Sequence, residues 1–521
     1  MRPNDPELME NSSPSGYQEL CAKREVRFTR REVLAMSGLG TMALTLSGCA
    51  TSAVDATPAG LAQPLCYSTA SQFARAIRAG QATSEEAVTA CLDRIEAVNP
   101  ILNAVVQLDR AGAVAAARAA DAAASRGEWM GPLHGVPMTI KDSFDTRGMI
   151  STGGTLGRKN HVPDADATVV RRLREAGAIL MGKTNTPELT LSFDTNNLIY
   201  GQSKNPYNLS LSPGGSSGGA GAIVAAGGSP FDIGSDYGGS IRSPAHVNGI
   251  CGIKPSAGRV PRTGHIYPFG GIQDSFQQIG PLARSVEDLA LLLPLIMGPD
   301  GVDPGVSPLS WNSPAEQTVG SFKVAWFTDN GIATPIEEVQ RAVHNAVGVL
   351  TGLGAQATEA RPTGIESTLD VALPVYFWDG GAAVQRLLQD YGTTEHTLAA
   401  LINGQVLTAE QLDGALVRLD AWRSRMLSFM SGFDVLVCPV NATTAFPTGA
   451  SFSQELVVRA SYVITFNANG WPALVVPSGL SHEGMPIGVQ VVAGPGREDL
   501  ALAAGLAIER ALNGYRRPQA V

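Results

Sequence analysis

The chain has 521 residues, of which 44% are hydrophobic, 16% are charged and 6% are aromatic, with 58 glycines and six cysteines. The low charge and high apolar content exclude intrinsic disorder over most of the chain, and six cysteines in so long a chain do not make a disulfide scaffold. The formal net charge of −9 argues against nucleic acid as a partner, because a nucleic-acid-binding protein carries a basic face. We therefore expect a large, well-packed and glycine-rich body.

The N-terminal segment differs from the rest of the chain. Residues 1–27 are polar and show no apolar periodicity, which predicts a leader without stable structure. Residues 28–49 resemble a twin-arginine export signal, because Arg30 and Arg31 precede a weakly apolar run that is too short to span a membrane. Residues 50–66 are rich in small side chains and predict a linker.

The apolar run of the leader ends in Leu-Ser-Gly-Cys, which resembles the lipobox of bacterial lipoproteins and makes Cys49 a candidate for lipidation. We therefore expect an exported protein that is periplasmic or anchored to a membrane through a lipidated Cys49. The alternative is a leader without a targeting function, in which case the protein is cytoplasmic.

The main body, residues 67–515, alternates predicted helices with predicted strands, which is typical of an α/β protein. Apolar residues at helical spacing predict helices over residues 68–128, with Thr83 as an N-cap that acidic residues follow. Further helices are predicted over residues 339–351 and 499–512. Short apolar runs predict buried strands over residues 178–181, 324–327, 435–437 and 473–476.

The pattern loosens between residues 301 and 434, where we expect the variation that faces the substrate. Tyr376, Phe377 and Trp378 form an aromatic cluster in this region. Such a cluster would line an acyl pocket or pack in the core, and the sequence does not decide between the two.

The first cluster that carries chemistry is GPLHGVPMTIKD, in which Lys141 follows a proline-fixed apolar strand. A lysine in apolar surroundings has its charged form disfavoured, so Lys141 is a candidate for a neutral base. The alternative is an ion-paired or snorkelling lysine without a catalytic role.

The second cluster is the glycine-rich loop SPGGSSGGAG, which contains Ser216 and Ser217. It lacks the lysine and the spacing of a phosphate-binding P-loop. It matches the nucleophile-elbow pattern GxSxG at both serines, although the residues before it predict a poor strand. The alternative is a turn-rich loop that caps a helix.

The third cluster is GSDYGGSIRSPA, in which two glycines precede Ser240. Adjacent glycines allow successive backbone N–H groups to point at one spot, which is how an oxyanion hole is built beside a nucleophile. The alternative is a tight turn into a helix.

Taken together, Lys141, Ser216 and Ser240 with the motifs around them resemble the amidase signature family. Further blocks that resemble the family are GKTNTPEL, GICGIKP, GPLAR, FDVLVCP and GWPALVVPSG…GMPIGVQVVAG. The resemblance covers about residues 68–512. It implies an α/β fold with a single large amidase-signature domain, in which a mixed central sheet is flanked by helices on both faces.

The resemblance also implies a role for each matching residue. Ser240 would be the nucleophile, Ser216 would follow a cis peptide bond and relay protons, and Lys141 would be the neutral base. The oxyanion hole would consist of the backbone N–H groups of Tyr237, Gly238, Gly239 and Ser240. The positions that brace this loop would be Ser217, Asp236 and Arg242.

The expected reaction is hydrolysis of small or peptide-like amides to a carboxylic acid and ammonia or an amine, through an acyl-enzyme on Ser240 and without a cofactor. The alternatives are aryl-acylamidase or ester hydrolase activity on the same triad, or a binding lipoprotein that keeps the fold without turnover. An amidotransferase subunit is disfavoured, because that work is cytosolic and the leader resembles an export signal. The amide substrate and the oligomeric state do not follow from the sequence.

Other chemistries find little support. The seven histidines are too far apart in the sequence to match the spacing of metal ligands, and the motif CxxC does not occur. We therefore expect no metal site. A Ser–His–Asp hydrolase would need His482, which falls in SHEG, a predicted hairpin turn. Cys91, Cys251 and Cys438 are expected to be buried small hydrophobic residues.

Overall fold

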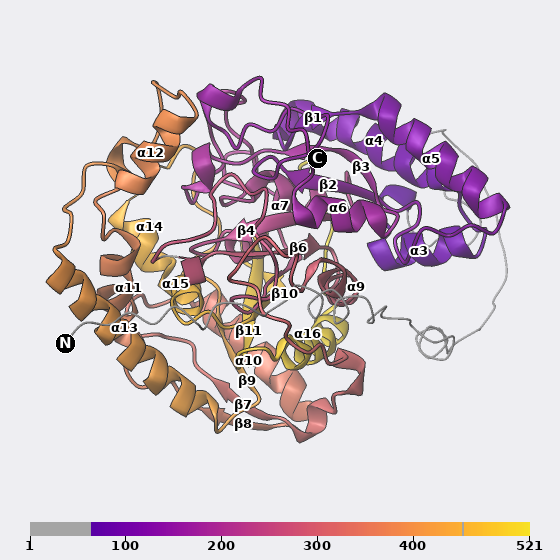
Figure 1. Ribbon diagram of the computed structural model, residues 1–521. Coiled ribbons are helices and arrows are strands. Elements are labelled where there is room, and N and C mark those ends of the chain that lie inside the picture. The colour runs from indigo at the N-terminus through magenta and orange to yellow at the C-terminus, as the bar shows by residue number, and fades with distance from the viewer. Residues whose placement is uncertain (1–63, 273, 451–452) are drawn as a thin grey trace, which may run out of the picture. The chain divides into compact units, whose positions relative to one another are not determined.

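The computed structural model describes residues 64–272, 274–450 and 453–521 (Figure 1). The predicted leader, the predicted export signal with Cys49 and nearly all of the predicted linker lie outside the described residues. The described chain begins with a short 3₁₀ helix, Leu65–Tyr67, in which Leu65 and Tyr67 are buried.

The first part of the body builds a small sheet with helices around it. Its elements are α3 (Ala70–Arg78), α4 (Ser84–Leu102), β1 (Val105–Leu108), α5 (Arg110–Ser125), β2 (Pro137–Lys141), α6 (Thr168–Glu175) and β3 (Ile179–Thr184). β3 is the central strand of the three and runs antiparallel to β1 and parallel to β2. The predicted helices are confirmed here, and Thr83 and Glu86 form a capping box at the start of α4.

Strand β1 interrupts the segment that the sequence predicts as helical. α4 ends at Asn103, whose φ of 49° is left-handed. Asn99 Oδ1 accepts hydrogen bonds from the N–H groups of Ala104 (2.8 Å) and Val105 (2.7 Å). These local bonds offer the backbone an alternative to the helix, so the chain turns and enters β1.

The rest of the body builds a large sheet. Its strands are β4 (Phe231–Asp236), β5 (Cys251–Lys254), β6 (Gln278–Ala283), β7 (Lys323–Trp326), β8 (Gln356–Glu359), β9 (Val435–Pro439), β10 (Ala473–Leu480) and β11 (Pro486–Ala493). The helices are α7 (Gly218–Ala225), α8 (Arg242–Val247), α9 (Val286–Ile296), α10 (Glu337–Gly352), α11 (Thr368–Tyr376), α12 (Ala382–Asp390), α13 (Ala409–Met430), α14 (Gln454–Arg459), α15 (Ser461–Ala468) and α16 (Glu498–Leu512).

The large sheet is mixed, with the strand order β4-β6-β5-β10-β11-β9-β7-β8. β7 is parallel to β8 and β9, and the remaining neighbours are antiparallel. The predicted strands are confirmed as parts of β3, β7, β9 and β10, and the predicted helices over 339–351 and 499–512 as α10 and α16.

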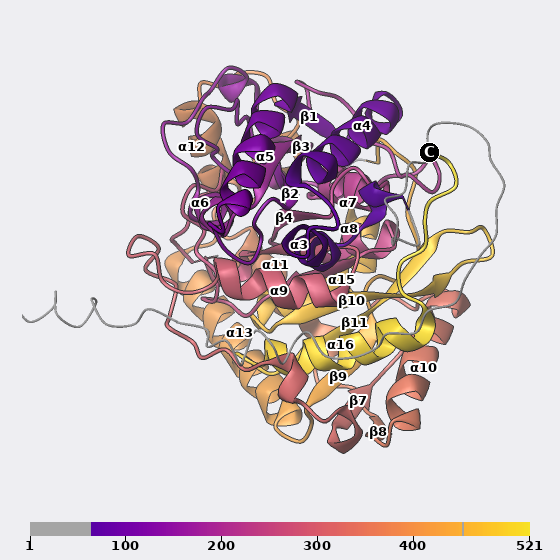
Figure 2. The ribbon, with the colours of Figure 1, turned by 90° about the vertical axis from the view of Figure 1, so that its right-hand side faces the viewer.

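Helices cover both faces of the large sheet, as predicted. Successive residues of β10 belong alternately to two buried clusters, since Leu474 and Val476 pack with α9, α10 and α16, whereas Ala473 and Val475 pack with α11, α13 and α15. Figure 1 shows α11, α13 and α15 on one side of these strands. Figure 2, turned by 90°, shows α9, α10 and α16 beside the same strands. This alternation is the period of two that a strand imposes.

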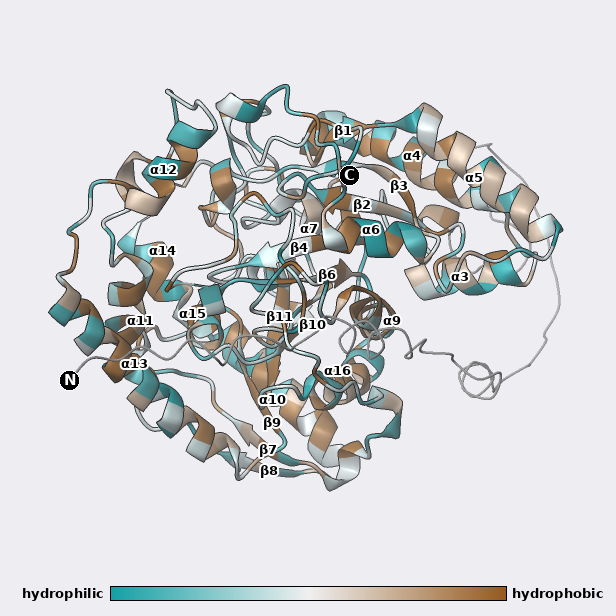
Figure 3. Ribbon diagram, in the orientation of Figure 1, coloured by the Kyte–Doolittle hydropathy of each residue, from teal (hydrophilic) through white to brown (hydrophobic). Residues whose placement is uncertain are grey.

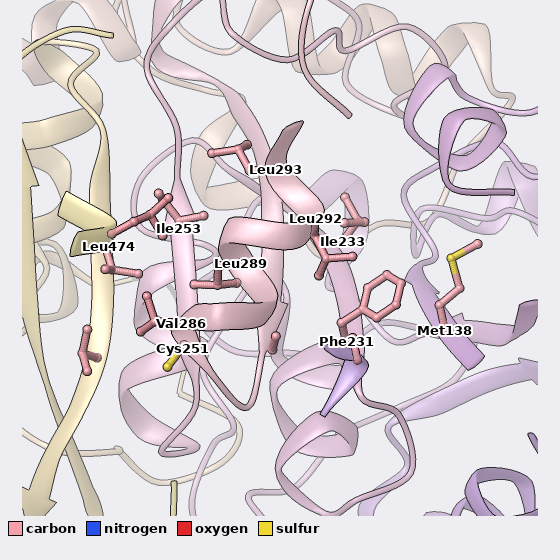
Figure 4. Packing of buried hydrophobic residues seen from close by; sticks show 14 of the residues in the cluster. Met138, Phe231, Ile233, Cys251, Ile253, Val286, Leu289, Leu292, Leu293 and Leu474 are labelled. Carbon is pink, nitrogen blue, oxygen red and sulfur yellow. The ribbon is translucent and has the colours of Figure 1, made fainter. Parts of the chain in front are cut away.

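The apolar residues follow the same arrangement. Figure 4 shows Leu289, Leu292 and Leu293 of α9 among residues of β4, β5 and β10. Helices α5 and α13 change between hydrophobic and hydrophilic along their length, as expected for helices with one buried face (Figure 3). No helix in the ranges given above has the length and apolar character needed to cross a membrane.

The two sheets meet at β2 and β4, which side chains join directly. Thr139 of β2 donates a hydrogen bond to Asp232 of β4 (2.6 Å), and Lys141 Nζ lies 3.0 Å from Ser235 Oγ. β4 ends at Asp236, and the turn that follows it carries Ser240 and leads into α8. This junction holds the candidate active site.

Candidate active site

Lys141 is the last residue of β2 and is completely buried. Its Nζ lies 2.8 Å from Ser216 Oγ, 3.0 Å from Ser217 Oγ and 3.0 Å from Ser235 Oγ. Three hydroxyl groups at hydrogen-bond distance hold the amine in one position. The structure thus brings two of the predicted residues, Lys141 and Ser216, into direct contact.

The electrostatic state of Lys141 follows from where β2 places it. Met138 and Ile140 point into the main core, so strand alternation directs Thr139 and Lys141 to the opposite face. Burial lowers the pKa of Lys141 to about 7, although the negative charges of Asp232 and Asp236 act in the opposite direction. A large fraction of this lysine is therefore neutral near pH 7, as a general base requires.

Ser216 lies in a glycine-rich loop that leads directly into α7. The Gly215–Ser216 peptide bond is cis, as the family resemblance implies. A Cβ on Gly215 would lie 2.7 Å from the Ser192 carbonyl oxygen, so the close backbone approach requires glycine. Ser217 is the N-cap of α7, and its N–H donates to the Ser240 carbonyl (3.2 Å). This bond ties the loop of Ser216 to the loop of Ser240.

Ser240 lies in the turn between β4 and α8 and is 7% exposed. With Tyr237 and Gly238 it lines a cavity, so a ligand in that cavity would contact it. Within the described ranges no hydrogen bond joins Ser240 Oγ to Ser216 Oγ, and catalytic hydrogen bonds often tighten only when substrate binds. The role of Ser240 as nucleophile stays a prediction.

A buried ion pair holds this turn. Arg242 donates to Asp236 through Nε (3.0 Å) and Nη2 (2.9 Å), and both side chains have no exposed surface. The same guanidinium reaches Gln490 Oε1 (2.7 Å) and Asn467 Oδ1 (2.5 Å). Burial by itself would raise the pKa of Asp236, but the Arg242 charge holds it well below its usual range. Asp236 therefore stays ionised.

The predicted oxyanion hole lies in the turn that Asp236 braces. The Gly239 N–H donates to Asp236 Oδ1 (2.8 Å), so in this structure it stabilises the turn. For the N–H groups of Gly238 and Ser240 the described part of the chain provides no acceptor. Both residues line the cavity, so their N–H groups are the candidate donors to a substrate oxygen. The oxyanion hole stays a prediction.

The cavity beside Ser240 is mainly apolar. Its other lining residues are Thr190, Leu191, Ser192, Phe193, Leu373, Tyr376, Phe377, Leu401, Val457 and Ile464. Two members of the aromatic cluster thus line it, whereas Trp378 lines a neighbouring cavity and Tyr237 borders both. The Tyr376 hydroxyl also donates to the Tyr237 carbonyl (2.6 Å), which ties α11 to the turn of Ser240.

Two buried residues of this site, Ser235 and Asp232, do not stand out in the sequence. Ser235 contacts Lys141, and Asp232 accepts hydrogen bonds from Thr139 (2.6 Å) and Thr184 (3.1 Å). Polar residues inside strands that are otherwise apolar would have been the signal, because buried polar groups need partners. PMTIK and FDIGSD both carry such residues.

The other predicted features of the chain lie elsewhere. His482 is in the turn between β10 and β11, as predicted, and pairs there with Glu338. Cys91, Cys251 and Cys438 are buried free thiols, as expected. No group of three or more His, Cys, Asp or Glu side chains within residues 64–272, 274–450 and 453–521 could hold a metal ion.

Comparison with known proteins identifies the family. A family model described as Amidase matches residues 86–502. The chain is 35% identical to an acylamidase of Rhodococcus erythropolis, over 84% of this chain and 94% of the relative. It is 36% identical to one subunit of the glutamyl-tRNA(Gln) amidotransferase of Moorella thermoacetica, over 87% of this chain and 98% of the relative.

Solved structures agree with the sequence relatives. A 6-aminohexanoate cyclic dimer hydrolase complexed with substrate superposes with a TM-score of 0.79 at 30% identity, over 87% of this chain and 99% of that chain. A bacterial aryl acylamidase superposes with a TM-score of 0.74 at 28% identity, over 86% and 97%. The fold and these comparisons define an amide hydrolase. The chain belongs to the amidase signature family, as its sequence predicts.

Proposed function

We propose that the protein hydrolyses carboxamides through an acyl-enzyme on Ser240, with Ser216 and Lys141 as the proton relay. The observation that carries this proposal is the buried amine of Lys141, 2.8 Å from Ser216 Oγ and with a pKa lowered to about 7. A charged lysine would only donate hydrogen bonds, whereas a neutral one can accept the proton of Ser216.

The proposed steps balance their protons within the triad. Lys141 accepts the proton of Ser216, Ser216 accepts that of Ser240, and Ser240 Oγ attacks the carbonyl carbon. The N–H groups of Gly238 and Ser240 bind the oxyanion. Ser216 then protonates the departing nitrogen as the C–N bond breaks, and Lys141 returns its proton to Ser216. Water attacks the acyl-enzyme by the same relay, which releases the carboxylic acid and restores the Ser240 hydroxyl.

The cavity supports amides with an apolar acyl group as substrates. Leu191, Phe193, Phe377 and Leu401 supply an apolar lining next to Ser240. A pocket of this kind binds a ligand mainly by burying apolar surface. The similarity to an acylamidase and to a bacterial aryl acylamidase supports the same class, which includes aryl amides.

A second candidate is the amide-hydrolysing subunit of an amidotransferase. The 36% identity to a glutamyl-tRNA(Gln) amidotransferase chain favours it, and a protein of this kind would work with partner subunits. The apolar cavity lining favours the first candidate, because the polar side chain of glutamine would find few partners there. Release of ammonia from free glutamine would support the second candidate.

The test measures release of ammonia or amine from acetamide, hexanamide, benzamide, acetanilide and glutamine, with an ester of matched acyl group. We expect turnover of the amides with larger apolar acyl groups and none with Ser240→Ala. Lys141→Ala should lose nearly all activity, whereas Lys204→Ala, at an exposed lysine, should lose little. Full activity of Ser240→Ala or Lys141→Ala would contradict the triad.

We also propose that the leader exports the protein and that Cys49 carries a lipid. The pair Arg30-Arg31 and the Leu-Ser-Gly-Cys motif support this proposal. Expression of the full chain with and without globomycin tests it, with Cys49→Ala as the control. Processing at Cys49 that globomycin blocks is the expected result, and unprocessed cytosolic protein would contradict it.

A further inference from the structure

Asp232 is a carboxyl group buried inside the protein, close to the catalytic lysine. It belongs to β4 and has no exposed surface. Its Oδ2 accepts hydrogen bonds from Thr139 Oγ1 (2.6 Å) and Thr184 Oγ1 (3.1 Å). Its Oδ1 has no hydrogen-bond partner among the residues that the structure describes. Burial disfavours the ionised form of this carboxyl group, whereas the hydrogen bonds that it accepts favour the ionised form.

Both hydrogen-bond partners of Asp232 lie next to Lys141. Thr139 precedes Lys141 by two residues on β2, so their side chains share one face of the strand. Thr184 of β3 is the cross-strand partner of Lys141. The carboxyl group thus lies against the same patch of the β2–β3 sheet as the lysine, and the two groups interact electrostatically.

We propose that Asp232 is a positioning residue whose protonation is coupled to that of Lys141, and that it sets the pH at which Lys141 becomes a neutral base. The inference rests on the role proposed above for Lys141. When Asp232 is ionised, its charge stabilises the ammonium form of the lysine. When Asp232 holds a proton, that attraction is absent and Lys141 releases its proton to solvent at lower pH.

Among the acids that interact with Lys141, Asp232 is the one whose protonation changes in the same pH range as that of the lysine. Burial raises the pKa of Asp232 to about 7, against the hydrogen bonds that it accepts and the charge of Lys141. Asp236 stays ionised through Arg242, and burial lowers the pKa of His265, which also faces Lys141, to about 3. These two groups therefore contribute a constant charge between pH 5 and pH 9.

One further titratable side chain, Lys183, interacts with Asp232. Lys183 of β3 points away from Asp232 toward Thr146 and Ser151 but interacts with it electrostatically, and burial lowers the pKa of that lysine to about 8. Lys183 lies 3.7 Å from Asp142, which is its own ion-pair partner. α7 and β6, which pack against β4, carry no titratable side chain. Asp232 is thus the group whose removal should move the titration of Lys141.

The test is the dependence of kcat/KM on pH, measured with a neutral amide from the panel above. In the wild-type enzyme the activity rises as Lys141 loses its proton. Asp232→Asn removes the neighbouring charge, so the midpoint of this rise should fall by about one pH unit. Thr139→Val removes a hydrogen bond that stabilises ionised Asp232, and should shift the midpoint in the same direction.

Three further variants make the result interpretable. The double variant Asp232→Asn with Thr139→Val should shift no further than Asp232→Asn, because Thr139 acts through the carboxyl group. Asp288→Asn removes another buried carboxyl, one that binds the N–H groups of Ala70 and Ser71, and should leave the midpoint unchanged. Lys141→Ala reports on the proposed function itself.

The outcomes separate the two hypotheses. If Lys141→Ala abolishes activity while Asp232→Asn and Thr139→Val keep the wild-type midpoint, the inference is wrong and the proposed function stands. If Lys141→Ala is fully active, the proposed function fails, and the inference fails with it. If Asp232→Asn does not fold, an unchanged midpoint in Thr139→Val is enough to overturn the inference.

Discussion

The ion pair between Arg242 and Asp236 should be the main support of the turn that carries Ser240. Asp236 Oδ1 and Oδ2 accept from the N–H groups of Gly239 (2.8 Å) and Ile241 (3.1 Å), which flank Ser240. Arg242 fixes this carboxylate through a two-point contact. We predict that Arg242→Met, which keeps much of the volume and removes the charge, weakens both stability and catalysis.

The size of the stability loss follows from what remains around Asp236. Removal of one partner of a buried ion pair costs about 3–5 kcal/mol. Asp236 keeps three backbone donors, including the N–H of residue 242 (3.4 Å), and Asn467 Nδ2 (2.8 Å), so we expect about 3 kcal/mol, the lower end of that range. Gln490 Oε1 and Asn467 Oδ1 each lose a charged donor, which adds to the loss.

The fall in kcat/KM of Arg242→Met should be larger than the unfolded fraction of the variant explains. Small displacements of groups that position a substrate reduce the rate by about 100-fold. We therefore expect kcat/KM of Arg242→Met to fall by about that factor under conditions where the variant is folded. Arg242→Lys keeps a charge but cannot form the planar two-point contact. Its kcat/KM should therefore lie between those of the wild type and Arg242→Met.

Two measurements check this prediction. Urea unfolding followed by tryptophan fluorescence gives the free energy of unfolding, and steady-state kinetics on folded protein give kcat/KM. A variant Arg242→Met that unfolds within about 1 kcal/mol of wild type, and keeps kcat/KM within a few-fold, would refute the reasoning. The ion pair would then be incidental to the turn.

Three further predictions concern the base, the turn and the cavity. With a neutral amide, kcat/KM should rise with pH through about 7, because Lys141 acts only in its neutral form; a rate that is flat from pH 5 to pH 9 would contradict this. Gly239→Ala should abolish activity and lower the melting temperature, since φ is +104° and its Cβ would lie 2.3 Å from Val463 Cγ2. Gly238→Ala is the matched control, because its Cβ would meet no atom within less than 4.0 Å, and it should stay folded. Phe377→Ala should raise KM about 10-fold for hexanamide or benzamide and leave acetamide unchanged, measured by initial rates.

Much of the architecture could be predicted from local sequence. The strands over 178–181, 435–437 and 473–476 are continuous apolar runs, and such runs are buried wherever they lie in the chain. The capping box at Thr83 is equally local, because the residues that form it are three positions apart. β1 was missed because side-chain hydrogen bonds of Asn99, not propensity, end the preceding helix.

In the candidate site, too, some features could be predicted from local sequence and others could not. The serines and the lysine stand out in the sequence because glycines and an apolar strand surround them, and the family resemblance gave each a role. That Ser235 touches Lys141, and that Asp232 lies behind it, could not be predicted, because nearly a hundred residues separate β2 from β4. Only the packing of the two sheets brings these side chains together.

The sequence by itself thus determined the family and the α/β class, and it predicted which side chains are reactive. The tertiary structure decided the chemical state of those side chains. Lys141 is a candidate base because folding removes it from water, and Asp236 is an anion because folding places Arg242 against it. Burial and long-range charge contacts depend on the whole fold, so no local pattern contains them.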